Sequence, residues 1–248
     1  MPNNYFRFKQ FIIYQDKCAM KVCTDACLFG AIAAGFIAEK ENIRVLDIGT
    51  GTGLLSLMCA QKNKTAIIEA VEIDAPAAQQ ASENFAASPW KERLTVQHIS
   101  IQQLTKLSPP ANASINQPFN FIISNPPFFE NDLKSQDNKR NLALHSSELN
   151  IEELLYAVKI LLHETGNFGV LLPYHRAEYF QKLAAEKGFY LIKKTLVKQT
   201  SGHDYFRSIL MFGRSPVNAI QDEIVIMDAY ANYSPAFQHL LQDYYLYL

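Results

Sequence analysis

The segment Val45-Leu-Asp-Ile-Gly-Thr-Gly-Thr-Gly53 leads from an apolar strand into three alternating glycines, and a helical apolar pattern follows from Leu54 to Gln61. Glycine has no Cβ, so the backbone between strand and helix can turn sharply and lie against a ligand. The dinucleotide fingerprint would place its third glycine at position 54, where this chain has leucine. The order Asp-x-Gly-x-Gly-x-Gly therefore favours S-adenosylmethionine (SAM) over NAD as cofactor.

Strand and helix patterns alternate on both sides of this loop. Strands are expected at 45–48, 67–72, 94–98, 119–124 and 168–172, with helices at 54–61, 75–87, 151–163 and 177–187. Two further strands, near 190–197 and 208–212, form a late antiparallel pair, the usual ending of the SAM-dependent methyltransferase fold. We therefore predict an α/β, Rossmann-like methyltransferase fold with a mostly parallel seven-stranded sheet, an antiparallel last strand and helices on both faces.

The whole chain, 1–248, is expected to be one domain. Residues 1–40 are predicted to form a hairpin at 5–17 and a helix at about 24–38 that together cover the cofactor pocket. The proline-rich stretch from 108 to 118 is expected to be a surface loop, and the charged segment from 130 to 141 has no apolar period.

Composition narrows the function classes. A net charge of −1 and a pI near 6.6 do not indicate a nucleic-acid binder, although a local basic patch matters more than the sum. The N-terminus lacks the order of a signal peptide and no apolar run is long enough to cross a bilayer, so we expect a cytoplasmic protein without a membrane partner. Cys18, Cys23 and Cys27 lack zinc-site spacing and have no neighbouring histidine, so no metal is expected.

The sequence Asn125-Pro-Pro-Phe128 follows the strand at 119–124. An amino group on an aromatic ring is a poor nucleophile because its lone pair is delocalised. Two acceptors, the Asn125 side-chain oxygen and the Pro126 carbonyl, would direct that lone pair at the methyl donor, and the prolines fix φ beforehand. A base could stack on Phe128. The expected catalytic residues are Asn125, Pro126, Pro127 and Phe128.

Two acidic residues are expected to act beside the glycine loop at 49–53. Glu72 ends the second strand, where a carboxylate can accept hydrogen bonds from both ribose hydroxyls of a nucleoside. Asp47 is expected beneath the loop, holding its amides or the amino group of the cofactor.

The chain resembles the bacterial tRNA1(Val) (adenine-37-N6)-methyltransferase family. The resemblance is carried by Phe6 to Phe11, by Met20-Lys-Val-Cys-Thr-Asp-Ala-Cys-Leu-Phe-Gly30, by the glycine loop and by Asn125 to Phe128. It implies transfer of a methyl group from SAM to N6 of adenosine 37 in the tRNA anticodon loop, with Thr24 and Asp25 bordering the methionine end of SAM. The expected cofactor-binding residues are then Thr24, Asp25, Asp47, Gly49, Gly51, Gly53, Glu72, Ile73, Ser100 and Ile101.

Two positions depart from the family pattern. Related enzymes commonly place an aspartate after the third strand for the adenine amine of the cofactor, whereas this chain has Ser100, so that serine or a backbone group must serve. Cys23 stands where glycine is common. Basic residues that could contact tRNA phosphates are Lys134, Lys139, Arg140, Lys193, Lys194, His203 and Arg207.

Other functions share these motifs. The same chemistry suits guanine N2 in ribosomal RNA and the side-chain amide of a protein glutamine, but those enzymes usually carry a sizeable extra N-terminal domain. A non-catalytic RNA-binding adaptor could keep the fold, although an intact glycine loop, Glu72 and Asn125 argue against that. The leading prediction is a monomeric tRNA (adenine-N6)-methyltransferase.

Overall fold

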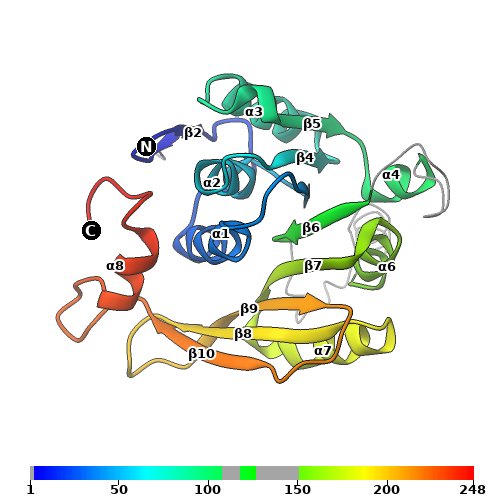
Figure 1. The fold of residues 1–248 in the computed structure, drawn as a ribbon. Coiled ribbons are helices and arrows are strands. Elements are labelled where there is room, and N and C mark those ends of the chain that lie inside the picture. Colours follow the sequence, from blue (N-terminus) through cyan, green and yellow to red (C-terminus); the bar gives the residue numbers. More distant parts are fainter. Residues whose placement is uncertain (1–2, 108–117, 127–150) are drawn as a thin grey trace, which may run out of the picture.

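An eight-stranded sheet lies at the centre of the computed structural model, which describes residues 3–107, 118–126 and 151–248 (Figure 1). Its strands follow one another in space as β10-β8-β9-β7-β6-β3-β4-β5. In chain order they are β3 (Arg44–Ile48), β4 (Ile67–Glu72), β5 (Leu94–His98), β6 (Phe119–Ser124), β7 (Leu162–Pro173), β8 (Tyr190–Lys198), β9 (Tyr205–Gly213) and β10 (Ile220–Val225).

The sheet is parallel except for β9, which pairs antiparallel with both β7 and β8. The predicted class, a mostly parallel sheet with helices on both faces, is confirmed. The predicted count of seven strands with the antiparallel strand last is corrected, because β10 follows β9 in the chain and adds to the edge of the sheet, parallel to β8.

The sequence pattern did not predict β10, because it is an edge strand with a polar sequence. Its first four residues are exposed, so no alternation of apolar side chains marks it. Instead, ion pairs to β8 support it: Lys193 Nζ lies 2.9 Å from Asp222 Oδ2, and Lys198 Nζ lies 3.2 Å from Glu223 Oε2.

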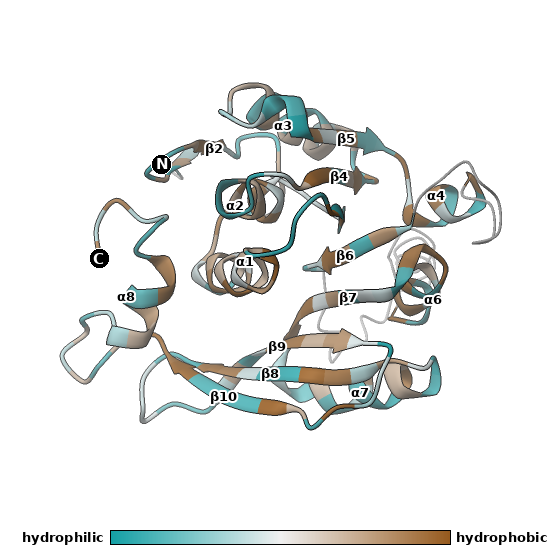
Figure 2. Ribbon diagram, viewed as in Figure 1, coloured by the Kyte–Doolittle hydropathy of each residue, from teal (hydrophilic) through white to brown (hydrophobic). Residues whose placement is uncertain are grey.

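Helices cover the two faces of the sheet in separate layers, each with its own hydrophobic core (Figure 1). One layer contains α1 (Thr24–Ile37), α2 (Leu54–Lys62), α3 (Ala75–Ala86) and α8 (Pro235–Leu241); the other contains α4 (Ile101–Leu107), α6 (Ile151–Leu161) and α7 (Ala177–Glu186). Figure 2 shows α1 as apolar on most of its circumference. This helix contacts α2, α8 and the sheet, so little of it faces water.

The N-terminal hairpin lies outside the main sheet. Its strands β1 (Tyr5–Arg7) and β2 (Ile12–Tyr14) pair only with each other among the described residues. Phe8 forms an isolated bridge with Tyr245, so both ends of the chain meet on the α1 face. The predicted loop at 108–118, apart from Pro118, and the charged segment at 130–141 fall outside the described residues. No helix within the described ranges has the length and apolar composition needed to span a bilayer.

Candidate active site

The ends of three neighbouring strands, β4, β3 and β6, place predicted site residues in one row. Ile48 pairs with Val71 of β4 on one side and with Ser124 of β6 on the other. The next residues along those strands are Gly49, Glu72 and Asn125. Because β3 and β6 flank the point where strand order reverses, this row borders the crevice where open α/β sheets bind their ligands.

A buried hydrogen bond joins the two central strands at that row. The Ser124 hydroxyl donates to the Ile48 carbonyl at 2.9 Å. This contact fixes the start of the Asn125 loop against the start of the glycine loop.

The glycine loop has the backbone geometry that only glycine adopts easily. Gly49, Gly51 and Gly53 have φ of +70°, +54° and +83°. A Cβ at Gly49 or Gly51 would meet no heavy atom within 4 Å, whereas a Cβ at Gly53 would lie 2.5 Å from the Phe85 ring. The first two glycines therefore leave space beside the loop, and the third permits close packing of α2 against α3.

Glu72 supports this loop from the neighbouring strand. Its Oε2 accepts a hydrogen bond from the Gly51 amide at 2.8 Å, and its Oε1 accepts one from the Asp74 amide at 3.0 Å. A carboxylate has about four acceptor sites, so each oxygen keeps one for a ligand. The two amides hold the carboxylate in place at the wall of a cavity.

A cavity of about 340 Å³ lies over the row of strand ends. Its lining combines the glycine loop, the ends of β4 and β6, the start of α4 and a segment before α1. The lining residues are Cys18, Ala19, Met20, Ile48, Gly49, Gly51, Val71, Glu72, Ile73, Asp74, Ala77, Ile99, Ser100, Ile101, Gln102, Asn125 and Pro126. Eight of the predicted site residues are among them: Gly49, Gly51, Glu72, Ile73, Ser100, Ile101, Asn125 and Pro126.

Asp47 lies beneath the loop, fully buried and outside the cavity lining. Its Oδ2 accepts hydrogen bonds from the hydroxyls of Thr50 at 2.6 Å and Ser56 at 2.7 Å. The carboxylate thus ties the glycine loop to the first turns of α2 through hydroxyls, where the sequence suggested loop amides. Burial raises its pKa to about 6, against the opposing effect of the two hydroxyl donors.

A pH dependence of stability follows from this pKa. The folded protein binds the Asp47 proton more tightly than the unfolded chain, in which the pKa of Asp47 is near 3.8. Stability from this group is therefore present below about pH 4 and lost as the pH rises through about 6, an effect on the order of 3 kcal/mol. We expect the free energy of unfolding of Asp47→Asn, measured by urea titration from pH 4 to 7, to lack this decline. Parallel curves for the two proteins would contradict the assignment.

Ser100 lies at the cavity wall and also caps the start of α4. Its hydroxyl oxygen accepts a hydrogen bond from the Gln103 amide at 3.2 Å, and its own amide donates to Gln103 Oε1 at 2.9 Å. This reciprocal capping box starts α4, a helix the sequence analysis did not predict. The Ser100 hydroxyl keeps its proton and a lone pair, and Ser100 lines the cavity.

Thr24 and Asp25 begin α1 but do not line the cavity. Asp25 Oδ2 accepts a hydrogen bond from Arg207 Nε of β9 at 2.7 Å, and its carboxylate is largely buried. The structure thus joins a residue expected at the cofactor to one expected at tRNA phosphates. This ion pair fastens the first turn of α1 to the sheet.

The segment that sequence reasoning left out of the site residues is Cys18-Ala19-Met20, between the hairpin and α1. Burial raises the pKa of the Cys18 thiol to about 11, with a smaller contribution from the charge of Glu72, so this cysteine stays protonated. The loop is closed by Gln15, whose Oε1 accepts from the Val22 amide at 2.8 Å.

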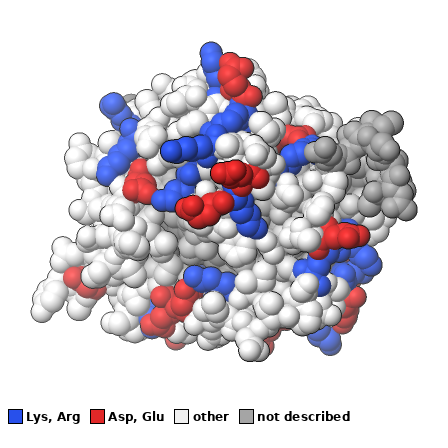
Figure 3. Space-filling model, in the orientation of Figure 1, with Lys and Arg blue, Asp and Glu red and all other residues white. Residues whose placement is uncertain are grey.

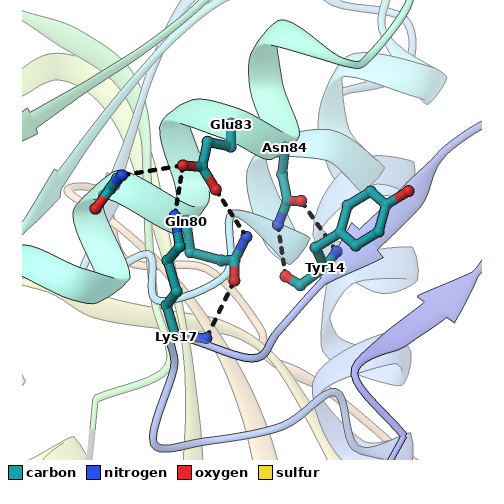
Figure 4. Close-up of polar contacts among 6 residues, drawn as sticks. Tyr14, Lys17, Gln80, Glu83 and Asn84 are labelled. Carbon is teal, nitrogen blue, oxygen red and sulfur yellow. Dashed lines mark hydrogen bonds and ion pairs between the residues drawn. The ribbon is translucent and has the colours of Figure 1, made fainter.

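Buried amide side chains of α3 hold the hairpin beside this loop (Figure 4). Asn84 Nδ2 donates to the carbonyls of Tyr14 and Thr52 at 2.8 Å each, and its Oδ1 accepts from the Tyr14 amide at 3.0 Å. Gln80 Oε1 accepts from the Lys17 amide at 3.2 Å. Asn84 therefore connects the hairpin, α3 and the glycine loop in one network.

Loss of this connection should weaken both stability and cofactor binding. We expect Asn84→Ala to lower the free energy of unfolding by about 2–4 kcal/mol, because three backbone groups lose their partner. The affinity for SAM, measured by calorimetry, should fall by about 3- to 10-fold. Gln79→Ala, on the exposed face of the same helix, is the matched control and should change stability by less than about 0.5 kcal/mol. Equal effects of the two substitutions would show that the network is not specific.

Several predicted RNA-contact residues already have partners within the protein. Lys193 pairs with Asp222 and Arg207 with Asp25, while the His203 ring bonds to Thr200 at 2.7 Å. On the face seen in Figure 3, acidic and basic side chains are interspersed. Lys194 is partly exposed on β8. Pro127, Phe128, Lys134, Lys139 and Arg140 lie outside the described residues.

All four cysteines are free thiols. In the described part of the chain, no three side chains of His, Cys, Asp or Glu gather as they would around a metal ion.

Comparison with known proteins assigns the chain to a family. A family model described as "Methyltransferase small domain" matches residues 32–158. Over almost its full length the chain is also similar to proteins named tRNA1(Val) (adenine(37)-N6)-methyltransferase. Identity is 42% to the one from Dyadobacter fermentans, covering 99% of each chain, and 39% to the one from Cronobacter sakazakii, covering 100% of this chain and 97% of that protein. The chain belongs to this methyltransferase family.

Solved structures agree on the fold. A predicted O-methyltransferase from Agrobacterium tumefaciens superposes with a TM-score of 0.65 at 14% identity, covering 86% of this chain and 95% of that one. TrmN from Thermus thermophilus gives a TM-score of 0.51 at 22% identity, covering 75% of this chain and 48% of that one. At these identities the likeness extends to the fold alone. Family and fold together make the chain a methyltransferase of the SAM-dependent type.

Proposed function

We propose that this protein transfers a methyl group from SAM to N6 of adenosine 37 in the anticodon loop of tRNA1(Val). The observation that carries the proposal is the single row formed by Gly49, Glu72 and Asn125 at the point where strand order reverses. Relatives named for this activity are similar to the chain over 99% of its length, which supports the choice of substrate. The anticodon loop is single-stranded, so turning out a base costs little compared with opening a duplex.

The residues present fit SAM. Glycines 49 and 51 leave open space beside the loop, so its backbone can lie against the cofactor. Glu72, held by two amides, would accept hydrogen bonds from the ribose hydroxyls, and Ser100 with the neighbouring backbone would face the adenine. Ile73 and Ile101 offer apolar walls for the ring. When bound, SAM supplies an electrophilic methyl group on a positively charged sulfur.

Asn125 and Pro126 would prepare the target nitrogen. The Asn125 side-chain oxygen and the Pro126 carbonyl accept hydrogen bonds from the two N–H groups of the adenine amine. These bonds orient the nitrogen lone pair toward the methyl group of SAM. Both residues line the cavity, and the bond from Ser124 to Ile48 fixes their position relative to the glycine loop. The nitrogen gains positive charge as it is methylated, so fixed acceptors stabilise it without a strong base, and the proton leaves afterwards to solvent.

The domain organisation is proposed on the same grounds. The hairpin and α1 lie within the first 40 residues, with the cavity-lining segment Cys18-Ala19-Met20 between them. We propose that residues 1–40 cover the cofactor within a single catalytic domain. A tRNA substrate implies a cytoplasmic site of action, and the proposed active species is a monomer.

The test is to supply labelled SAM with total tRNA, ribosomal RNA or ribosomal protein from a strain that lacks this activity. Digestion to monomers is expected to recover the label as N6-methyladenosine from tRNA. Label in N2-methylguanosine or methylglutamine would show that the substrate is ribosomal RNA or protein instead. SAM binding without transfer to any fraction would indicate an adaptor.

A further inference from the structure

Two tyrosines meet at the same edge of the sheet as Asn125. Tyr174 directly follows β7 and Tyr205 begins β9. Their ring centroids lie 5.4 Å apart at an interplanar angle of 41°. Tyr174 is 42% exposed, so the pair presents aromatic surface to solvent.

Strand register places this pair close to the proposed catalytic loop. Ser124 of β6 pairs with Val170 of the neighbouring strand β7, and Pro173 lies three residues farther along. At about 3.3 Å per residue, the end of β7 is about 10 Å beyond the row that contains Ser124, and one strand to the side. Stacked nucleotides are about 3.4 Å apart along a strand. Bases that flank a target held at Asn125 therefore come within reach of the two rings.

The charges around the pair are balanced rather than basic. Lys198 Nζ lies 5.1 Å from the centre of the Tyr205 ring, but the same ammonium pairs with Glu223, which also accepts a hydrogen bond from the Tyr205 hydroxyl. Arg207, two residues along β9, is paired with Asp25. Lys198 and Arg207 are therefore engaged within the protein, and the exposed aromatic faces offer a means of binding RNA bases.

We propose that Tyr174 and Tyr205 form a stacking platform for an unpaired RNA base next to the target adenosine. This inference rests on the proposed function, since it assumes an anticodon-loop substrate. Aromatic side chains bind single-stranded nucleic acid through ring stacking that every base can provide. A platform of this kind accounts for RNA binding by a chain whose net charge is only −1.

Kinetics of substituted enzymes test the platform. We expect Tyr174→Ala and Tyr205→Ala each to raise KM for tRNA about 10-fold, with kcat and the Kd for SAM changed less than about twofold. Tyr174→Phe and Tyr205→Phe keep the ring and should retain wild-type KM. The matched control is Tyr179→Ala on α7, which removes an exposed tyrosine that is not part of the ring pair. Thermal unfolding of each variant confirms that the comparison is between folded proteins.

The contrary results are equally defined. The platform is refuted if both alanine variants keep the wild-type KM. It is also refuted if Tyr205→Phe raises KM as much as Tyr205→Ala, which would assign the effect to the Glu223 hydrogen bond. A second assay needs no catalysis: fluorescence anisotropy of a labelled unpaired RNA heptamer, which should bind the wild type about 10-fold more tightly than Tyr174→Ala. Transfer to tRNA by the wild type with equal heptamer binding by both proteins would refute the platform and leave the proposed function intact.

Discussion

Replacement of Asn125 by alanine is expected to lower kcat for methyl transfer to tRNA by about 10²- to 10³-fold. The substitution removes one of two acceptors that orient the amino group, and a preorganised acceptor at a reacting atom has an effect of this size. The affinity for SAM should change by less than about threefold, because Glu72 and the glycine loop remain. Single-turnover kinetics with saturating tRNA and SAM measure the chemical step directly.

Two variants control this experiment. Asn120→Ala removes an asparagine from the same strand, where its Oδ1 accepts a hydrogen bond from the Arg44 amide outside the cavity, and it should leave kcat unchanged. Asn125→Asp keeps an acceptor oxygen and should retain more activity than Asn125→Ala. If folded Asn125→Ala transfers methyl groups at the wild-type rate, the proposed orientation of the nucleophile is wrong.

Replacement of Glu72 by alanine should raise the Kd for SAM about 100-fold. The variant loses the acceptors for the ribose hydroxyls and also the contacts to the Gly51 and Asp74 amides, each a charge-assisted hydrogen bond of about 1.5–3 kcal/mol. Isothermal titration calorimetry with SAM measures the affinity without any RNA.

Glu69→Ala is the matched control because Glu69 lies on the same strand, where it pairs with Arg44 outside the cavity. Its Kd for SAM should stay within about twofold of wild type, although its stability can fall. A wild-type Kd in Glu72→Ala would remove Glu72 from the cofactor site.

The sequence predicted those parts of the molecule that depend on neighbours in the chain. Strands β3, β4 and β6 are short apolar runs, and the glycines between β3 and α2 all adopt positive φ. Since parallel strands align their carboxyl ends, placing Glu72 and Asn125 at two such ends was enough to bring them to one cavity.

Long-range polar contacts could not be predicted in the same way. Asn84 binds residues 70 and 32 positions away in the chain, and the Asp25 to Arg207 pair spans 182 positions. Neither contact produces a local sequence pattern, because an isolated polar side chain on a helix is usually interpreted as solvent-exposed. The capping box of Ser100 and Gln103 did carry a local signal, serine followed three residues later by glutamine, and α4 was missed although that signal is present.

The proposed reaction methylates one adenosine in the anticodon loop. The most direct measurement compares transfer of label from SAM to two transcripts of tRNA1(Val), one with adenine and one with guanine at position 37, followed by nucleoside digestion. We expect N6-methyladenosine from the first transcript and no label in the second. Equal labelling of both transcripts, or label in another nucleoside, would contradict it.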